Sequence, residues 1–299
     1  MALADSHENR TVGILWMLAT MFCFIALDAI MKHLLESLPL VQVTWGRFFF
    51  ATIIAIMVCG KRLPTLLKSK SPKMQGLRSV LLMMTTGAFN AGIRSTPLAT
   101  GITIMFLSPI LITVLSIPLL GEKVGIRRWL GVIAGFAGAV IVVQPWKGGL
   151  DVIGAGVLFL LLAALLNANY QLLTRVVRHD APLTTLVFTA AAGAIVSSFI
   201  VPWFWSWPSA YEWMLLVLSG GAGAAGHLCL IRSLRAAPAS VVAPFSYSSL
   251  IWATVLGYLI WQDWPDVYTW IGAAVIIGSG LYIFHRERVL NRTVIVDQP

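Results

Sequence analysis

Long apolar runs alternate with short polar breaks along almost the whole chain of 299 residues. The runs hold about 20 residues each, which is the length that a helix needs to cross the hydrocarbon core of a bilayer. The breaks gather proline, glycine and charge, as in K-R-L-P, S-K-S-P-K, Q-P-W-K-G-G and Q-D-W-P-D. This pattern predicts ten membrane-spanning helices, at residues 12–32, 40–60, 75–94, 97–120, 126–145, 151–174, 183–203, 211–232, 238–261 and 267–285.

The composition points to a membrane protein rather than a soluble domain. Hydrophobic residues make up 58% of the chain and charged residues 11%, against about 25% charged residues in an average soluble domain. One soluble core cannot hide that surplus of apolar side chains. Lipid accommodates it, provided that the spanning segments satisfy their own backbone hydrogen bonds as helices do. We therefore expect an all-α integral membrane protein.

Positive charge indicates how the helices are oriented. If the N-terminus lies in the cytoplasm, 17 of the 21 lysines and arginines fall in predicted cytoplasmic loops or tails or at the cytoplasmic ends of the spans. Only Lys32, Arg47, Arg94 and Lys147 fall elsewhere. Cytoplasmic loops of membrane proteins carry such an excess, so we expect a multi-pass protein of the plasma (inner) membrane with both termini in the cytoplasm. The net charge of +9 then calls for no nucleic-acid partner.

Two halves of the chain resemble each other at an offset of 141 residues. W-L-G at Trp129 matches W-I-G at Trp270, and Gly13 matches Gly154. A shorter match, I-R-S at residues 93–95 and 231–233, has an offset of 138. These matches predict two five-helix repeats, at residues 1–147 and 148–299. Because five is odd, the second repeat is inverted in the membrane, an architecture of secondary transporters that bind substrate between the halves.

The segment P-L-L-G-E-K-V-G-I-R-R-W-L-G-V-I-A-G-F-A-G-A-V-I-V-V, which begins at Pro118, carries a family resemblance. It resembles the drug/metabolite transporter superfamily, within it the ten-span EamA type, and most of all the YddG-type amino-acid exporters. The resemblance implies export of small metabolites, amino acids including aromatic ones among them, by alternating access through a central cavity. The second half departs from the motif, with Gln262-Asp263 in place of Gly121-Glu122.

Polar side chains inside the predicted spans are the candidates for binding substrate, because such groups are costly in lipid and need partners. Met83, Thr86 and Asn90 share one helical face, and Asn167 and Tyr170 share another. An equally simple interpretation of each is a hydrogen bond between helices. The complete predicted set of substrate-binding residues is Asn90, Thr86, Met83, Asn167, Tyr170, His227, Ser246, Tyr247 and Arg47.

Charged groups inside the spans are few. We expect Asp28 to lie near the outer end of its helix, away from the midplane, and to pair with Lys32, four residues further along the same helix. Arg47 could extend toward the headgroups, pair with Asp28, or hold a substrate carboxylate. With no other carboxylate expected near the midplane, facilitated diffusion is favoured over ion coupling. A single cavity cation also counts against a nucleotide-sugar carrier, which needs several cations for phosphates.

Three prolines, Pro109, Pro118 and Pro244, interrupt apolar runs and are expected to kink helices that could act as gating hinges. The chain has no phosphate-binding loop, no cluster of acidic and histidine residues, and no metal-ligand spacing, so we expect neither an enzyme nor a cofactor or metal. The expected partners are the lipid bilayer and a small-molecule substrate, and we expect a monomer. The alternatives are a drug or nucleotide-sugar carrier of the same superfamily, or a membrane enzyme.

Overall fold

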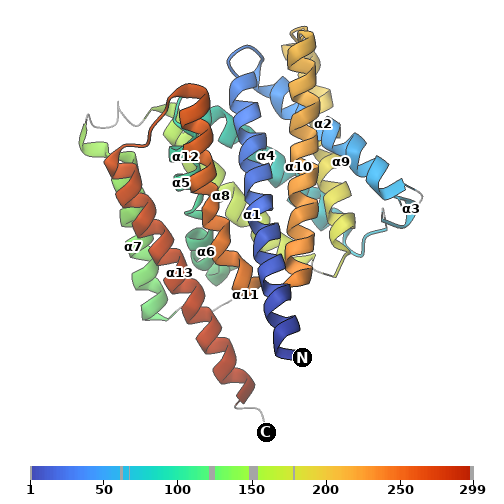
Figure 1. The fold of residues 1–299 in the computed structure, drawn as a ribbon. Helices are drawn as coiled ribbons and strands as arrows, with labels where there is room; N and C mark the ends of the chain where they lie inside the picture. The colour runs from blue at the N-terminus through green and yellow to red at the C-terminus, as the bar shows by residue number, and fades with distance from the viewer. Residues whose placement is uncertain are drawn as a thin grey trace.

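The computed structural model describes residues 2–60, 63–66, 68–120, 125–147, 154–177 and 179–296, and all regular structure in these residues is helical. Figure 1 shows a bundle of long helices that run roughly side by side. The elements are α1 (Ala2–Leu34), α2 (Leu40–Cys59), α3 (Leu63–Leu66), α4 (Pro72–Ile93), α5 (Leu98–Met105), α6 (Ser108–Leu120), α7 (Ile126–Val143), η2 (Pro145–Lys147), α8 (Ala155–Val176), α9 (Pro182–Ile200), η4 (Val201–Phe204), α10 (Ala210–Ala236), α11 (Ala239–Val242), η5 (Ala243–Tyr247), α12 (Ser248–Trp261) and α13 (Val267–Val296).

Some predictions fall on residues that lie outside this description. Gly121-Glu122 and the start of the second predicted repeat, residues 148–153, are among them. The same holds for the loop residues Lys61, Arg62, Lys123 and Arg178.

Eight helical segments of the described residues are long and apolar enough to cross a membrane. They coincide with eight of the ten predicted spans, within a few residues at each end. The other two predicted spans correspond to α4, which has 22 residues but a lower mean hydropathy, and to the apolar segment Arg128–Val143 of α7.

Local sequence explains where several helices begin. Proline stands at the first or second position of α4 and α9, where the missing N–H has no helical partner to lose. The start of α10 carries a capping box, in which Ser209 accepts from the Glu212 amide and the Glu212 carboxylate accepts from the Ser209 amide. Two helices end on residues with left-handed backbone, Gln144 after α7 and Gln262 after α12.

Two of the predicted spans are broken near their middle, and proline explains both breaks. Pro109 has no N–H to offer the Met105 carbonyl, and the chain turns at residues 106–107 between α5 and α6. Pro244 lies in the 3-10 segment η5 between α11 and α12. Pro118 lies inside α6, which continues to Leu120. The two breaks meet, because the rings of Phe106 and Tyr247 pack edge to face with centroids 5.0 Å apart.

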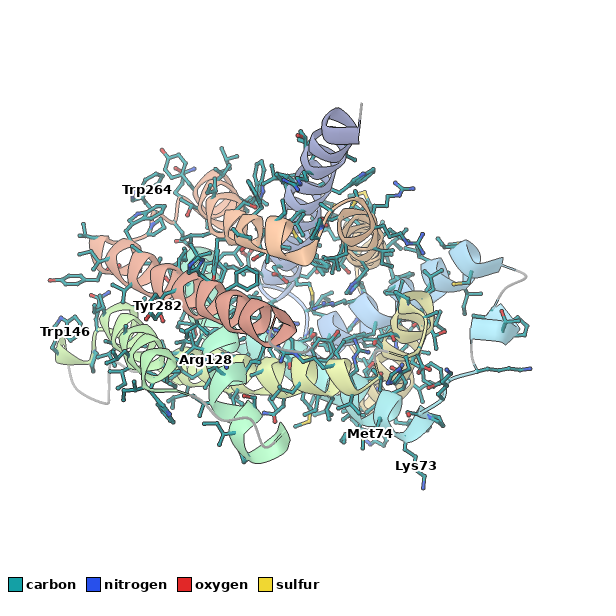
Figure 2. The ribbon with its side chains drawn as sticks, turned by 90° about the horizontal axis from the view of Figure 1, so that it is seen from below. Lys73, Met74, Arg128, Trp146, Trp264 and Tyr282 are labelled. Atoms are coloured by element: carbon teal, nitrogen blue, oxygen red, sulfur yellow. The ribbon has the colours of Figure 1, made fainter. Side chains whose placement is uncertain are left out.

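The main packing pairs join the first part of the chain to the second: α1 with α10, α4 with α8, α2 with α9, and α7 with α13. Figures 1 and 2 both show α7 and α13 side by side at one edge of the bundle. Small residues allow these close approaches: a Cβ on Gly138 would lie 3.0 Å from the Gly272 carbonyl oxygen, and the Ser279 hydroxyl donates to the Gly131 carbonyl.

The bundle has two distinct ends. α1 begins and α13 ends at the same end (Figure 1). Asp180, which connects α8 to α9, and Arg235, near the end of α10, border one cavity at that end. We call it the Asp180 end. The opposite end, where α1 finishes close to Lys32, is the Lys32 end.

Candidate functional site

A cavity of about 260 Å³ lies in the middle of the bundle. It receives side chains from four helices of the first half, α1, α2, α4 and α5, and from two of the second half, α8 and α10. Aromatic and aliphatic groups make up most of the wall, with a few convergent polar groups, as is typical of sites for organic ligands. The lining residues are Phe24, Leu27, Asp28, Arg47, Leu82, Thr85, Thr86, Phe89, Ile102, Met105, Asn167, Tyr170 and His227.

Arg47 and Asp28 bring opposite charges to this cavity. The Arg47 Nη1 atom donates to the Thr86 hydroxyl at 3.1 Å, and the guanidinium lies 5.4 Å from the Phe48 ring. Asp28 attracts Arg47 electrostatically, but no ion pair within 4.0 Å joins them. Both groups therefore keep hydrogen-bonding capacity for a ligand that carries a carboxylate and a cation.

A larger cavity of about 530 Å³ opens at the Asp180 end. Tyr170 and His227 line both this cavity and the central one. A small pocket of about 30 Å³ beside Arg47 and Thr189 also borders His227. The three spaces therefore adjoin one another around His227, between the Asp180 end and the centre of the bundle.

Arg78 of α4 lies in the wall of the larger cavity, only 3% exposed. Its guanidinium donates to the Thr174, Thr189 and Tyr170 hydroxyls at 2.6, 2.7 and 2.6 Å. Its carbon Cζ lies 4.5 Å from the centroid of the Tyr170 ring. All of these partners are neutral, so the positive charge of Arg78 has no carboxylate beside it among the described residues.

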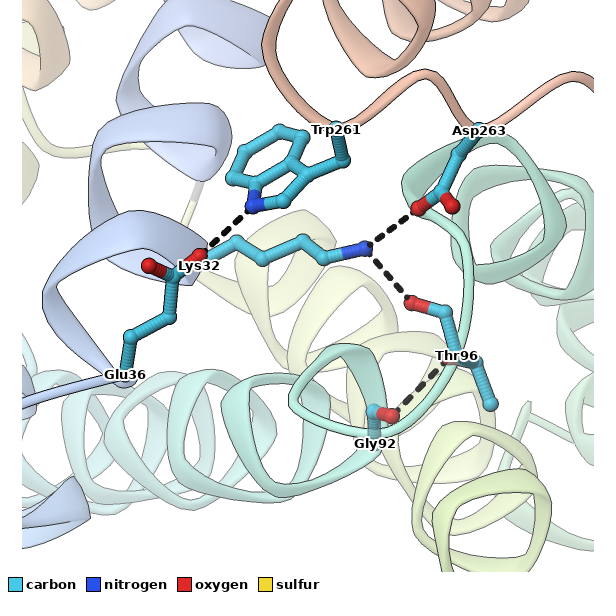
Figure 3. Close-up of polar contacts among 6 residues, drawn as sticks. All are labelled: Lys32, Glu36, Gly92, Thr96, Trp261 and Asp263. Atoms are coloured by element: carbon cyan, nitrogen blue, oxygen red, sulfur yellow. Dashed lines mark hydrogen bonds and ion pairs between the residues drawn. The ribbon is translucent and has the colours of Figure 1, made fainter.

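The Lys32 end is closed by polar contacts, which Figure 3 shows. The Lys32 ammonium donates to the Asp263 carboxylate at 3.1 Å and to the Thr96 carbonyl at 3.0 Å, and it lies 4.7 Å from the Trp261 ring centroid. Trp261 in turn donates to Glu36 at 2.6 Å. These contacts tie α1, the α4–α5 connection and the α12–α13 connection together at this end.

The Asp180 end has a contact of another kind, outside the predicted spans. The Asp180 carboxylate accepts from the Gln75 side chain at 2.8 Å, from the Ser69 hydroxyl and from the Lys70 amide at 3.0 Å. These hydrogen bonds, that of Gln75 first, favour the ionised form and hold the pKa of Asp180 below its ordinary value. The contact fastens the start of α4 to the α8–α9 connection and leaves the larger cavity open beside it.

Five of the nine predicted binding residues meet at the central cavity: Arg47, Thr86, Asn167, Tyr170 and His227. The other four do not line it. Asn90 is fully buried and donates to the Thr44 hydroxyl at 3.2 Å, a contact between helices. Ser246 donates to the Ala243 carbonyl within its own turn, Tyr247 packs on Phe106, and Met83 is half-buried elsewhere on α4.

Two expectations about charged residues are wrong. Lys32 pairs with Asp263 rather than Asp28, because the α12–α13 connection brings a carboxylate to it from 231 residues away. Asp28 lies on the central cavity rather than at the outer edge of the bundle. The reason for favouring facilitated diffusion, the lack of a carboxylate at the centre, is thereby removed.

The sequence interpretation also missed Arg78, which it assigned to a cytoplasmic loop. The signal was available in the helical period, because residues 78, 82, 85 and 89 lie on one face of α4, and the last three line the central cavity. The predicted face, with Met83 and Asn90, lies to one side of it.

Several proteins named as transporters or exporters resemble this chain over most of its length. An S-adenosylmethionine uptake transporter of Rickettsia conorii is 27% identical over 96% of this chain and 98% of its own. A riboflavin transporter of Rhizobium johnstonii is 29% identical over 96% of this chain and 95% of its own. A pseudopaline exporter of Pseudomonas aeruginosa is 23% identical over 89% of this chain and 93% of its own.

A solved crystal structure with 21% identity superimposes with a TM-score of 0.61, covering 91% of this chain and 98% of the other, and supports the fold alone. The model of the EamA-like transporter family matches twice, at residues 11–144 and 154–284. Both the family and these named relatives are transporters rather than enzymes. The chain belongs to the EamA-like transporter family and is embedded in a membrane.

Proposed function

We propose that this protein is a secondary transporter of ten membrane-spanning helices, built as two inverted five-helix repeats, that carries a small zwitterionic metabolite by alternating access. The single observation that carries the proposal is the arrangement of the cavities. A charged and aromatic cavity at the centre adjoins a larger one at the Asp180 end, while an ion pair and hydrogen bonds join three segments at the Lys32 end. Alternating access requires a central site that reaches one face of the membrane at a time.

Reciprocal contacts support the inverted repeat. With an offset of 141, Gly131 corresponds to Gly272 and Gly138 to Ser279. Gly131 contacts Ser279, and Gly138 contacts Gly272, so each contact is the image of the other. As the residue number increases along α7, the residue number of its partner on α13 decreases, so the two helices are antiparallel. Such exchange of partners is expected of a two-fold axis that crosses the pair at right angles, in the plane of the membrane.

The short I-R-S match supports the same axis. Ser233 of the second half donates to the Gly13 carbonyl at the start of the first repeat. Its counterpart Ser95 lies against Gly156, at the start of the second repeat. On this basis α4 and α7 are the remaining two spans, since they correspond to α10 and α13 by offset and by packing.

The basic loops suggest that the Asp180 end faces the cytoplasm. Lys70, Arg175 and Arg235 lie beside the helix ends there, as the positive-inside rule predicts for the plasma (inner) membrane. Large aromatic side chains are exposed in the segments assigned to the outer side, among them Trp203, Trp207 and Trp264. Trp side chains of this kind settle at the headgroup level. The structure then represents the state that opens to the cytoplasm.

The cavity chemistry favours an amino-acid-like substrate with a planar apolar group. Arg47 suits a carboxylate, Asp28 suits an ammonium or sulfonium, and Phe24, Phe89 and Tyr170 offer ring faces. Amino acids, aromatic ones included, fit this description. S-adenosylmethionine, which the Rickettsia relative takes up by name, is a second candidate because it joins an amino acid and a cation to an aromatic base.

Flux into proteoliposomes tests the proposal. The purified protein is reconstituted and supplied with labelled L-phenylalanine, L-tryptophan or S-adenosylmethionine, with and without a pH gradient. We expect saturable flux of at least one compound, reduced at least tenfold in Arg47→Gln and unchanged in Arg94→Gln, an exposed arginine at the Lys32 end. Absence of saturable flux for all three compounds contradicts the proposed substrate class, and dependence on the pH gradient identifies proton coupling.

A further inference from the structure

Positively charged side chains lie one after another between the Asp180 end and the central cavity. Arg78 lines the cavity at the Asp180 end, Arg47 lines the central cavity, and His227 borders both. Both guanidinium groups act electrostatically on His227. Arg235 also borders the cavity at the Asp180 end but is exposed. An anionic group that moves from that end to the centre therefore passes Arg235 and the buried Arg78 before it reaches Arg47.

Arg78 is held in place but not neutralised. The Thr174 and Thr189 hydroxyls donate their own hydrogens to carbonyls one turn back on their helices, at 2.8 and 2.7 Å, so they can only accept from Arg78. An arginine has five N–H groups, and the three contacts described above use one on Nε and one on each terminal nitrogen. One N–H on each terminal nitrogen is left without a described partner, so the guanidinium keeps two donors for a further acceptor such as a carboxylate.

We propose that Arg78 is a carboxylate-binding subsite in the cavity at the Asp180 end, a first station for the acidic group of the substrate before Arg47 binds it at the centre. The subsite deepens the proposed function and rests on it. Tyr170 connects the two stations, because its hydroxyl accepts from Arg78 while its ring also borders the central cavity. The ligand class is an organic carboxylate, and a neutral amide of the same shape is excluded because it brings no charge to match the guanidinium.

Binding of benzoate, compared with benzamide, tests the subsite without any need for transport. Stabilisation of the full-length protein in detergent is followed by thermal unfolding as either compound is added. In Arg47→Gln, which leaves Arg78 as the remaining station, we expect benzoate still to stabilise saturably and benzamide to have no effect. In the double variant Arg47→Gln, Arg78→Gln the benzoate effect is lost. Lys73→Gln, an exposed charge on the same helix that points away from the bundle in Figure 2, leaves it unchanged.

Arg78 also connects α4 to α8 and α9, so its removal could unfold the protein. Arg78→Lys in the Arg47→Gln background keeps the charge and loses the two-pronged geometry, and we expect it to weaken benzoate binding about tenfold. The inference is overturned if benzoate binding vanishes in Arg47→Gln alone, or if it is unchanged in both the Gln and the Lys variant at position 78. Either result leaves the proposed function standing, since that is decided by flux through the wild-type protein.

Discussion

The ion pair between Lys32 and Asp263 gives the sharpest test of alternating access. We expect Asp263→Asn to make opening at the Lys32 end easier, because the amide keeps the shape of the carboxylate and loses its charge. Lys32 is 8% exposed and the Asp263 side chain 35%. A hydrogen bond between charged groups contributes about 1.5–3 kcal/mol and a neutral one about 1 kcal/mol. With a discount for the exposure of Asp263, the substitution costs the closed state about 1–2 kcal/mol.

This cost corresponds to a shift of about 5- to 30-fold in the ratio of open to closed molecules. It is measured as a labelling rate. Ala99, on α5 close to Thr96, is 3% exposed, and it is replaced by the single cysteine of an otherwise cysteine-free variant. A bulky maleimide applied from the Lys32 side reacts only when this end opens. If opening and closing are fast, the rate is proportional to the open population, however small that population is. We expect the rate to rise by the same 5- to 30-fold.

A matched control variant and a double-mutant cycle decide between the ion pair and a general effect of charge. Arg94→Gln removes an exposed charge from the same end and leaves the Lys32 contacts in place, and we expect less than a twofold change in rate. Lys32→Met together with Asp263→Asn should shift the rate by less than the product of the two single changes, because the pair is lost only once. An unchanged rate in Asp263→Asn, or an equal rise in Arg94→Gln, would refute the assignment of this pair as the closing contact.

Three further predictions concern the centre, the Asp180 end and the packing of the repeats. Arg47→Lys should lower Vmax/KM for a transported carboxylate less than Arg47→Gln does, since an ammonium keeps the charge without the two-pronged geometry; equal rates in both variants and the wild type would contradict a binding role. Asp180→Asn should lower the Tm at pH 7. Folding lowers the pKa of Asp180, so its carboxylate stabilises the protein fully at pH values above the ordinary pKa and progressively less as the pH falls through the lowered pKa. The Tm difference between the wild type and Asp180→Asn should therefore be constant from about pH 5 to 8 and shrink only below about pH 4. A difference that shrinks above pH 5 contradicts this. Gly138→Ala places a Cβ 2.8 Å from an Ile276 methylene carbon and should destabilise the protein by about 1–3 kcal/mol. Gly278→Ala, with nothing within 4 Å, should have little effect in the same unfolding measurement.

Much of the fold could be predicted because its cause is local. Runs of apolar residues indicate spans wherever they occur, and Pro109 and Pro244 point to the interrupted helices from sequence alone, although Pro118 lies within α6. The repeat was visible for a related reason, since glycines such as Gly131 and Gly272 are required by close helix contacts in both halves of the chain.

The candidate site was harder to predict because it depends on which helix faces meet. A helical period indicates that Thr86 and Asn90 lie near one face, but only packing decides that Thr86 reaches the cavity and that Asn90 bonds to Thr44. The partner of Lys32 lies 231 residues away, so the nearer Asp28 was the natural and wrong choice. Spacing along the sequence favours partners that are close in sequence, whereas packing of the bundle brings together residues that are far apart in sequence.

In the proposed alternating-access mechanism, differences between the two repeats determine which state is favoured. In a carrier with two inverted halves, the second state is approximately the first with the roles of the halves exchanged. Closure of the Asp180 end would then use the counterparts of the contacts that close the Lys32 end. The counterpart of Lys32 at the 141-residue offset is Leu173, which can form no ion pair. The state closed at the Lys32 end therefore holds a charged contact that the other state lacks. That contact accounts for about 1–2 kcal/mol, and a gap of this size leaves both states populated, as a carrier that must pass through both requires.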